Sequence, residues 1–271
     1  MNWDKAITTI TPHVVKIETP HGHGTGFLAF YNHNKSWCGI ATAAHVVAHA
    51  DEWQEPIRIR NEGSPKFLKE EDRLIFIDRN TDSAVVLFLK GDFQLPEVPI
   101  TLLPMDEPCS IGVDVGWLGY PAIEPYTLCF FDGTVSARQG ARKAYLIDGV
   151  AIHGVSGGPV FHCPDSERVL IIGCISSYHA NRVTGETLPG LSRAQDVSHF
   201  HETLGRIRSI DDARVKKQEF EQAQKAEAER ASSEAPAPDA DRPEVAGERV
   251  RHSFSRGRTR RIVPVRKSVT D

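Results

Sequence analysis

The chain has 271 residues, of which 40% are hydrophobic and 25% charged, and its formal net charge is −4 at pH 7. These values are typical of a globular protein with one large or two small domains, and they argue against a nucleic-acid or membrane partner for the chain as a whole. The N-terminal residues lack the basic start and apolar run of a secretory signal, and no later segment is long enough to span a bilayer.

The five cysteines include no Cys-x-x-Cys pair, and their number is odd. This pattern favours free thiols in a reducing compartment over a disulfide framework. We therefore expect a cytoplasmic protein without a structural disulfide.

Short runs rich in β-branched and aromatic residues follow one another from about residue 10 to residue 196. Examples are "HVVKIET", "GTGFLAFY", "SAVVLFL", "VDVGWLGY" and "VLIIGCISSY", separated by Gly, Pro, Asn and Asp. Such spacing predicts an all-β barrel or sandwich rather than alternating strands and helices. Residues 91–110 contain four prolines and are predicted to cross between two halves.

The periodicity becomes helical after residue 197. Phe200, Leu204 and Ile207 recur at helical spacing, which predicts a short helix that docks on the β body. Residues 211–230 are charged and rich in alanine, which predicts a solvated helix.

Residues 231–271 are predicted to be a disordered linker followed by a basic tail, because they contain too little apolar surface to offset the entropy of the chain. The tail, residues 249–267, carries eight Arg and Lys and no acidic residue. It is a candidate anchor for an anionic partner or for self-association. Attraction to the acidic remainder of the same chain is the simpler alternative.

The stretch "AIHGVSGGPVFHC", residues 151–163, places three glycines around one serine, Ser156. Glycine is favoured where the backbone bends sharply or approaches another group closely. The pattern fits a glycine-rich hairpin turn, and it also fits a nucleophile whose neighbouring N–H groups face a developing negative charge.

A nucleophilic serine needs a base, and the base needs an orienting carboxylate. In "GIATAAHVVAHA" an apolar run ends in small residues before His45, as a buried strand would deliver an imidazole to the edge of a cleft. In "FIDRNTDSAVVLFL", Asp82 comes directly before an apolar strand. Each residue alone has a structural explanation, but their order along the chain favours a His-Asp-Ser arrangement.

The motifs "GTGFL" (24–28), "TAAHVV" (42–47), "DRNTDSAVVLF" (78–88) and "GVSGGPV" (154–160) resemble those of trypsin-like serine proteases, and their spacing is most similar to the HtrA-type members. The resemblance covers residues 10–208. It implies two perpendicular six-stranded β-barrels, at about 10–95 and 108–196, with the active site in the cleft between them and a closing helix at 197–208.

By the same resemblance, His45 is the general base, Asp82 orients it, and Ser156 attacks the scissile carbonyl. The N–H groups of Gly154 and Ser156 form the oxyanion hole. The implied activity is that of a serine-type endopeptidase (a hydrolase) that acts on protein or peptide substrates without a cofactor. The alternative is a protease fold retained as a binding or regulatory module, with the basic tail as its anchor.

Specificity follows from the same alignment. Val150 falls at the base of the primary pocket, Ser176 and Tyr178 fall in one wall, and Gly190 falls in the other. Because the alignment puts no carboxylate at the base, we expect cleavage after small or medium aliphatic residues.

Two histidine motifs offer a metal-binding alternative. His45 and His49 are four residues apart, as zinc ligands on a helix are, but "HVVAH" lacks the glutamate that activates water. The sequence "HGHG", residues 21–24, has metal-ligating side chains, although a loop between strands explains it as well. No metal site is therefore predicted.

Overall fold

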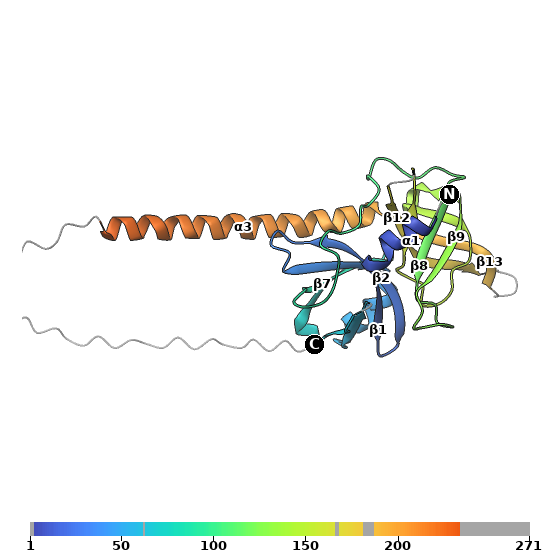
Figure 1. Cartoon of the computed structure of the whole chain (residues 1–271), viewed down its shortest axis with the longest axis horizontal. Helices are drawn as coiled ribbons and strands as arrows, with labels where there is room; N and C mark the ends of the chain where they lie inside the picture. The colour runs from blue at the N-terminus through green and yellow to red at the C-terminus, as the bar shows by residue number, and fades with distance from the viewer. Residues whose placement is uncertain (1–2, 62, 166–167, 181–186, 234–271) are drawn as a thin grey trace, which may run out of the picture. The chain divides into compact units, whose positions relative to one another are not determined.

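Two β-rich halves, joined by an irregular segment, make up most of residues 14–196 (Figure 1). The computed structural model describes residues 3–61, 63–165, 168–180 and 187–233, and for residues 178–180, 187–189 and 231–233 it describes the backbone alone. The expectation of an all-β body followed by a helix is confirmed.

The first half is a seven-stranded sheet in the order β5-β4-β1-β2-β3-β7-β6, with antiparallel neighbours throughout. Its strands are β1 (Val14–Thr19), β2 (Gly22–Tyr31), β3 (Trp37–Thr42), β4 (Ile57–Arg60), β5 (Lys66–Leu68), β6 (Arg73–Asp78) and β7 (Ser83–Leu89). Helix α2 (Ala44–Glu52) connects β3 to β4, and the 3₁₀ turn η2 (Glu70–Asp72) connects β5 to β6. The β-branched and aromatic side chains of these strands form the core, as their composition predicted.

The edge strands β5 and β6 do not pair with each other, so the first of the two expected six-stranded barrels is wrong in both strand number and closure. The short turn η2 joins these strands without a ladder, and a buried side chain spans the gap. The guanidinium of Arg73, on β6, donates hydrogen bonds to the carbonyl oxygens of Leu68 (3.0 Å), Ala50 (3.0 Å) and Glu55 (2.6 Å). The Leu68 carbonyl is at the end of the edge strand β5, whereas the Ala50 and Glu55 carbonyls lie in α2 and in the segment after it, so Arg73 connects the start of β6 to both places.

The second half is a closed barrel in the order β10-β13-β12-β11-β8-β9. Its strands are β8 (Asp114–Gly119), β9 (Cys129–Gln139), β10 (Ala144–Asp148), β11 (Pro159–His162), β12 (Leu170–Ala180) and β13 (Thr187–Asp196), with the 3₁₀ turn η3 (Gly140–Arg142) between β9 and β10. The fully buried Trp117, Tyr145 and Phe161 form the centre of its core. The six-stranded barrel predicted for this half is confirmed.

The N-terminal helix α1 (Trp3–Ile10), followed by the 3₁₀ turn η1 (Thr11–His13), was not predicted from the sequence. The ring of Trp3 lies 5.5 Å from that of Phe130 and 5.7 Å from that of Phe161. The chain therefore begins by packing on the second half before it enters β1 of the first half (Figure 1).

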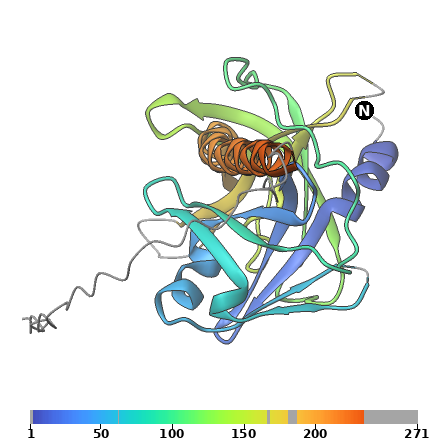
Figure 2. The same cartoon turned by 90° about the vertical axis from the view of Figure 1, so that its left-hand side faces the viewer.

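Helix α3 (Ser198–Ser233) begins between the two halves (Figures 1 and 2). Phe200, Leu204 and Ile207 are buried as predicted, and Phe200 meets Phe27 of β2 edge to face at 5.9 Å. Two helical segments, 197–208 and 211–230, were predicted. One continuous helix covers both, because residues 209 and 210 include neither glycine nor proline.

Residues 234–271, and with them most of the predicted linker and the whole basic tail, lie outside the described residues. Of the helices in the described ranges, none combines the length and the apolar character that crossing a membrane requires. All five cysteines are free thiols.

Candidate active site

His45 and Asp82 meet at the start of helix α2. The ring Nδ1 of His45 lies 3.0 Å from Oδ1 and 2.9 Å from Oδ2 of Asp82, and the backbone N–H of His45 donates to Oδ1 at 2.9 Å. His45 was expected at the end of a strand. The strand β3 in fact ends at Thr42, and His45 is the second residue of α2.

Asp82 also replaces the missing cap of α2. The N-cap residue is Ala43, whose side chain cannot accept a hydrogen bond, so the first N–H groups of the helix need another acceptor. Asp82 supplies its carbonyl oxygen to the N–H of Ala44 (3.1 Å) and its carboxylate to the N–H of His45. Its backbone has φ +50°, a left-handed conformation that aspartate tolerates better than most residues. One residue therefore starts the helix and fixes the imidazole on it.

Ser176 completes the surroundings of this carboxylate. It is the extra residue of a bulge in β12, between the pairs Ile175–Ala194 and Ser177–Arg193. A bulge can re-aim a side chain, and the Ser176 hydroxyl donates to Oδ2 of Asp82 at 2.5 Å. Ser176 was predicted in the pocket wall, but its hydroxyl is committed to the carboxylate.

The pKa of Asp82 reflects these contacts. Burial acts to raise this pKa, but the hydrogen bonds from His45 and Ser176, together with the charge of His45, outweigh it and hold the pKa below its ordinary value. The carboxylate is thus ionised and able to accept a hydrogen bond from the Nδ1–H of a neutral or protonated imidazole.

Ser156 lies in a partly exposed loop between β10 and β11. Gly154 and Gly157 on either side of it have φ +90° and +83°, which disfavours any residue with a Cβ. A Cβ on Gly154 would lie 2.3 Å from the Tyr120 oxygen, and one on Gly157 would lie 2.1 Å from the Thr25 oxygen. The glycines of the motif are therefore required by both the turn and close backbone approach.

Thr25 of β2 holds this loop from the other half of the molecule. Its N–H donates to the Ser156 oxygen at 2.8 Å, and its hydroxyl donates to the Gly154 oxygen at 2.9 Å. Its hydroxyl also accepts from the Tyr120 N–H at 3.0 Å. No role was predicted for Thr25, and its place inside the motif "GTGFL" is the only signal that the sequence offers for it.

The loop lies beside the beginning of α2. A Cβ on Gly24 would lie 2.5 Å from a methyl of Val46 and 3.1 Å from the Ser156 oxygen, so one position touches both elements. Among the described residues, no hydrogen bond joins the Ser156 hydroxyl to His45. Such bonds are commonly long in the absence of a substrate and shorten in the complex.

The N–H groups of Gly154 and Ser156 donate no hydrogen bond to any described residue. The carbonyl of His153, which precedes them, accepts instead from the N–H of Ala122 at 2.6 Å. This carbonyl therefore points toward Ala122 rather than into the loop, and the N–H groups of Gly154 and Ser156 are both available to a ligand.

The other residues predicted for the pocket are only partly brought together. Val150 is 49% exposed, and its neighbour Gly149 donates its N–H to the Gly190 oxygen at 2.8 Å. The side chain of Tyr178 lies outside the described residues. The Asp148 carboxylate oxygen lies 3.5 Å from the position of a Cβ on Gly190, so a carboxylate does stand beside the predicted wall. The predicted position of the pocket base, Val150, lies two residues after Asp148 and so gave no sign of this carboxylate.

An open sheet and a closed barrel that bring a histidine–aspartate pair to a glycine-rich serine loop define a serine peptidase of the chymotrypsin type. Residues 24–173 match the trypsin-like peptidase domain, which is more than half of the chain. The chain therefore belongs to the trypsin-like serine peptidases, which confirms the prediction of a serine-type endopeptidase.

Solved structures of the same fold include three proteases. The serine endoprotease from Yersinia pestis is 18% identical, with 77% of this chain and 67% of that chain covered and a TM-score of 0.57. Deg5 is 18% identical, with 73% and 90% covered and a TM-score of 0.54. The Rv3671c protease of M. tuberculosis in an inactive form is 20% identical, with 74% and 91% covered and a TM-score of 0.53. No curated protein sequence matches the chain.

Proposed function

We propose that the protein hydrolyses peptide bonds through His45, Asp82 and Ser156. The observation that carries the proposal is the Asp82 carboxylate, which receives two N–H groups of His45 and the hydroxyl of Ser176 beside the serine loop. This arrangement fixes the His45 tautomer with its proton on Nδ1 and leaves Nε2 to accept a proton.

In this mechanism Nε2 of His45 takes the proton of the Ser156 hydroxyl while the oxygen attacks the substrate carbonyl. The negative charge that develops on the carbonyl oxygen is stabilised by the N–H groups of Gly154 and Ser156, each contributing about 2.7–4 kcal/mol to the transition state. His45 then gives its proton to the leaving amine, and water hydrolyses the acyl-enzyme by the same route.

For specificity we propose cleavage after small or medium aliphatic residues, with Val150 at the base of the pocket. Asp148, beside Gly190, supports the competing preference for lysine or arginine. Paired peptides that differ only in valine or lysine before the scissile bond separate the two. If the lysine peptide is preferred and Asp148→Asn removes that preference, the aliphatic assignment is wrong.

For the remaining properties we propose a protein of a reducing compartment, the cytoplasm, on the basis of its five free thiols. We propose further that the basic tail, residues 249–267, binds an anionic partner or mediates self-association. Its charge of eight Arg and Lys without an acidic residue supports this role.

The central proposal is tested by labelling the full-length protein with a fluorophosphonate, which reacts only with an activated serine. We expect one label per chain, no label on Ser156→Ala, and normal labelling of Ser110→Ala, which removes an exposed hydroxyl. Cleavage of casein should follow the labelling and should resist chelators. A folded wild-type protein that takes no label would instead support the alternative, a protease fold that serves as a binding module.

A further inference from the structure

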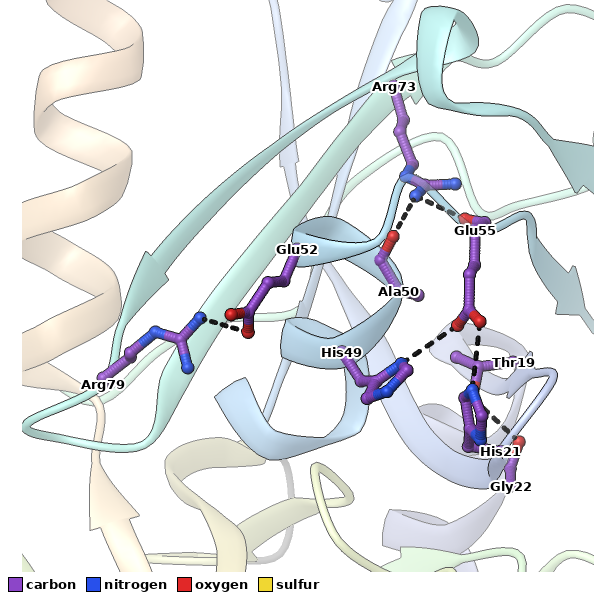
Figure 3. A network of polar contacts seen from close by, with 9 residues as sticks. All are labelled: Thr19, His21, Gly22, His49, Ala50, Glu52, Glu55, Arg73 and Arg79. Carbon is purple, nitrogen blue, oxygen red and sulfur yellow. Dashed lines mark hydrogen bonds and ion pairs between the residues drawn. The ribbon is translucent and has the colours of Figure 1, made fainter.

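One histidine of the motif "HGHG", His21, and one of the motif "HVVAH", His49, lie side by side in the structure. His45 faces Asp82, whereas His49, one helical turn later, faces His21 of the β1–β2 turn and Glu55 of the segment after α2 (Figure 3). Nε2 of His21 lies 3.0 Å from Oε1 of Glu55, and Nδ1 of His49 lies 3.1 Å from Oε2.

These three side chains have the spacing of a metal site. Their ligating atoms all lie within 4.8 Å of one another, and no other group of this kind occurs in the part of the chain that the structure describes. Ligands at about 2.0–2.2 Å from a tetrahedral Zn²⁺ are roughly 3.4 Å from each other. The 3.0 and 3.1 Å separations end on different oxygens of Glu55, so binding an ion through one oxygen requires the carboxylate to turn and the separations within the 4.8 Å limit to shorten toward this value.

The backbone of Glu55 is fixed by hydrogen bonds on both sides. The N–H of Glu55 donates to the Ala50 oxygen at 2.8 Å, and the Glu55 oxygen accepts from the buried guanidinium of Arg73 at 2.6 Å (Figure 3). Arg73 also bonds the Ala50 oxygen, so the end of α2 and the backbone of Glu55 share one clamp. These bonds fix the backbone position from which the Glu55 side chain reaches the two histidines.

The surface of the group is open. The side chains of His21 and His49 are 56% and 51% exposed, so an ion and a fourth ligand can approach from solvent. Desolvation raises the pKa of Glu55, but the hydrogen bonds from the two histidines outweigh it and keep the pKa below its ordinary value. Exposed histidine–carboxylate pairs contribute little to the stability of a fold. Stability alone therefore does not explain why two histidines bond the same carboxylate.

We propose that His21, His49 and Glu55 form a binding site for a divalent transition-metal ion of the Zn²⁺ class, with a solvent molecule as fourth ligand. Two imidazoles and one carboxylate suit Zn²⁺, whereas Ca²⁺ and Mg²⁺ prefer oxygen ligands alone. The site is separate from the His45–Asp82 pair and requires no role for the ion in peptide hydrolysis.

Occupancy of this site links two elements that reach the active centre. His49 is on the helix that carries His45, and His21 immediately precedes β2, whose Thr25 holds the Ser156 oxygen. An ion bound in the folded state alone stabilises the fold by mass action. Zn²⁺ should therefore raise the melting temperature of the whole protein.

The test is a titration of the full-length protein with Zn²⁺ in competition with a chromophoric chelator, together with melting curves. We expect one ion per chain, and an affinity at least tenfold weaker in each of His21→Gln, His49→Gln and Glu55→Gln. His45→Gln and His33→Gln are matched controls, since each removes an exposed histidine that bonds a single aspartate. Both controls should bind Zn²⁺ like the wild type.

Co²⁺ provides an independent readout, because a tetrahedral site with imidazole ligands gives an intense visible spectrum that His49→Gln should abolish. The proposal is overturned if wild-type protein that is folded binds no Zn²⁺. It is also overturned if His49→Gln and Glu55→Gln bind the ion as tightly as the wild type, or if His45→Gln alone loses it.

Discussion

The two β halves differ in closure, since one is a closed barrel and the other is a sheet with two free edges. In the second half, hydrogen bonds run around the full circle of strands from β8 to β13. In the first half, β5 and β6 remain edges, and the Arg73 side chain of β6 bonds one carbonyl at the end of β5 and two carbonyls in and after α2. In the closed half, backbone hydrogen bonds fix the loop of the candidate site. In the open half, side-chain hydrogen bonds fix its histidine and aspartate.

The difference is visible at the candidate site. The Ser156 loop of the closed half is tied to β12 by backbone bonds, with the Gly157 N–H donating to the Ile175 oxygen and the Ile175 N–H donating to the Gly158 oxygen. His45 and Asp82 of the open half depend on a carboxylate and on a helix that has no cap of its own. Single side-chain changes should therefore damage the open half more than the closed one.

The largest effect is expected for Asp82→Asn. An amide cannot orient a neutral imidazole in the required tautomer, so we expect kcat to fall by about a thousand- to ten-thousandfold. The measurement is peptide hydrolysis at pH 7. Asp78→Asn, at the other end of the same turn, is the control and should retain activity within a few-fold. Activity of Asp82→Asn near that of the wild type would remove Asp82 from the mechanism.

The next largest effect concerns the gap between β5 and β6. Arg73→Met keeps the apolar stem but removes the three hydrogen bonds that the guanidinium donates to carbonyl groups, so we expect the free energy of unfolding in urea to fall by about 2–4 kcal/mol. Arg79→Met is the matched control, because its exposed pair with Glu52 contributes at most about 1 kcal/mol (Figure 3). Equal losses in both variants would mean that the three hydrogen bonds of Arg73 contribute no more than an exposed ion pair.

A smaller effect is expected for Ser176→Ala, which removes one donor from the Asp82 carboxylate. We expect kcat/KM to fall about tenfold, since a hydrogen bond to a charged group contributes about 1.5–3 kcal/mol. Ser83→Ala, which removes a buried hydroxyl bonded to a neutral one, should change kcat/KM much less.

The pH dependence of stability sharpens this test. The pKa of Asp82 is lowered in the folded protein, so its contribution is present above the unfolded pKa of about 3.9 and is lost as the pH falls through the lowered folded pKa. The Ser176→Ala substitution raises this folded pKa. Its deficit in unfolding free energy should therefore be largest near neutral pH and shrink below about pH 3.9. A deficit that does not depend on pH would indicate lost packing alone.

The smallest effect is expected for truncation after Glu248. Removal of the basic tail should leave hydrolysis of a short peptide within a few-fold of the full chain, while salt-dependent binding to an anionic partner is lost. Peptide hydrolysis that disappears with the tail would show that the tail contributes to the active site itself.

Parts of the molecule with local signals could be predicted from the sequence. Strand composition identified the all-β body, and the spacing of Phe200, Leu204 and Ile207 identified the docking face of α3. His45, Asp82 and Ser156 each stand in a short motif, and it was the order of the three motifs along the chain that singled these residues out.

Features that depend on distant segments could not be predicted. Ser176 reaches Asp82 only because a bulge displaces it, and sequence carries no sign of that bulge. His45 and His49 were considered as a pair of metal ligands because they are four residues apart. In the structure His45 bonds Asp82 at the start of α2, and His49 bonds Glu55 near its end. The acceptors of Arg73 likewise come from three separate segments, so its position at the open edge of the first sheet could not be predicted.

The hydrogen bonds of Thr25 have a consequence for the order of folding. They connect β2 to a loop 129 residues further along the chain, so these contacts can form only after the whole first half and the first strands of the second half are present. Contacts of such long sequence separation are slow to form. During refolding, reactivity toward a fluorophosphonate should therefore appear later than the β-sheet signal in circular dichroism, and a nascent chain that ends before Gly154 should not react with the probe.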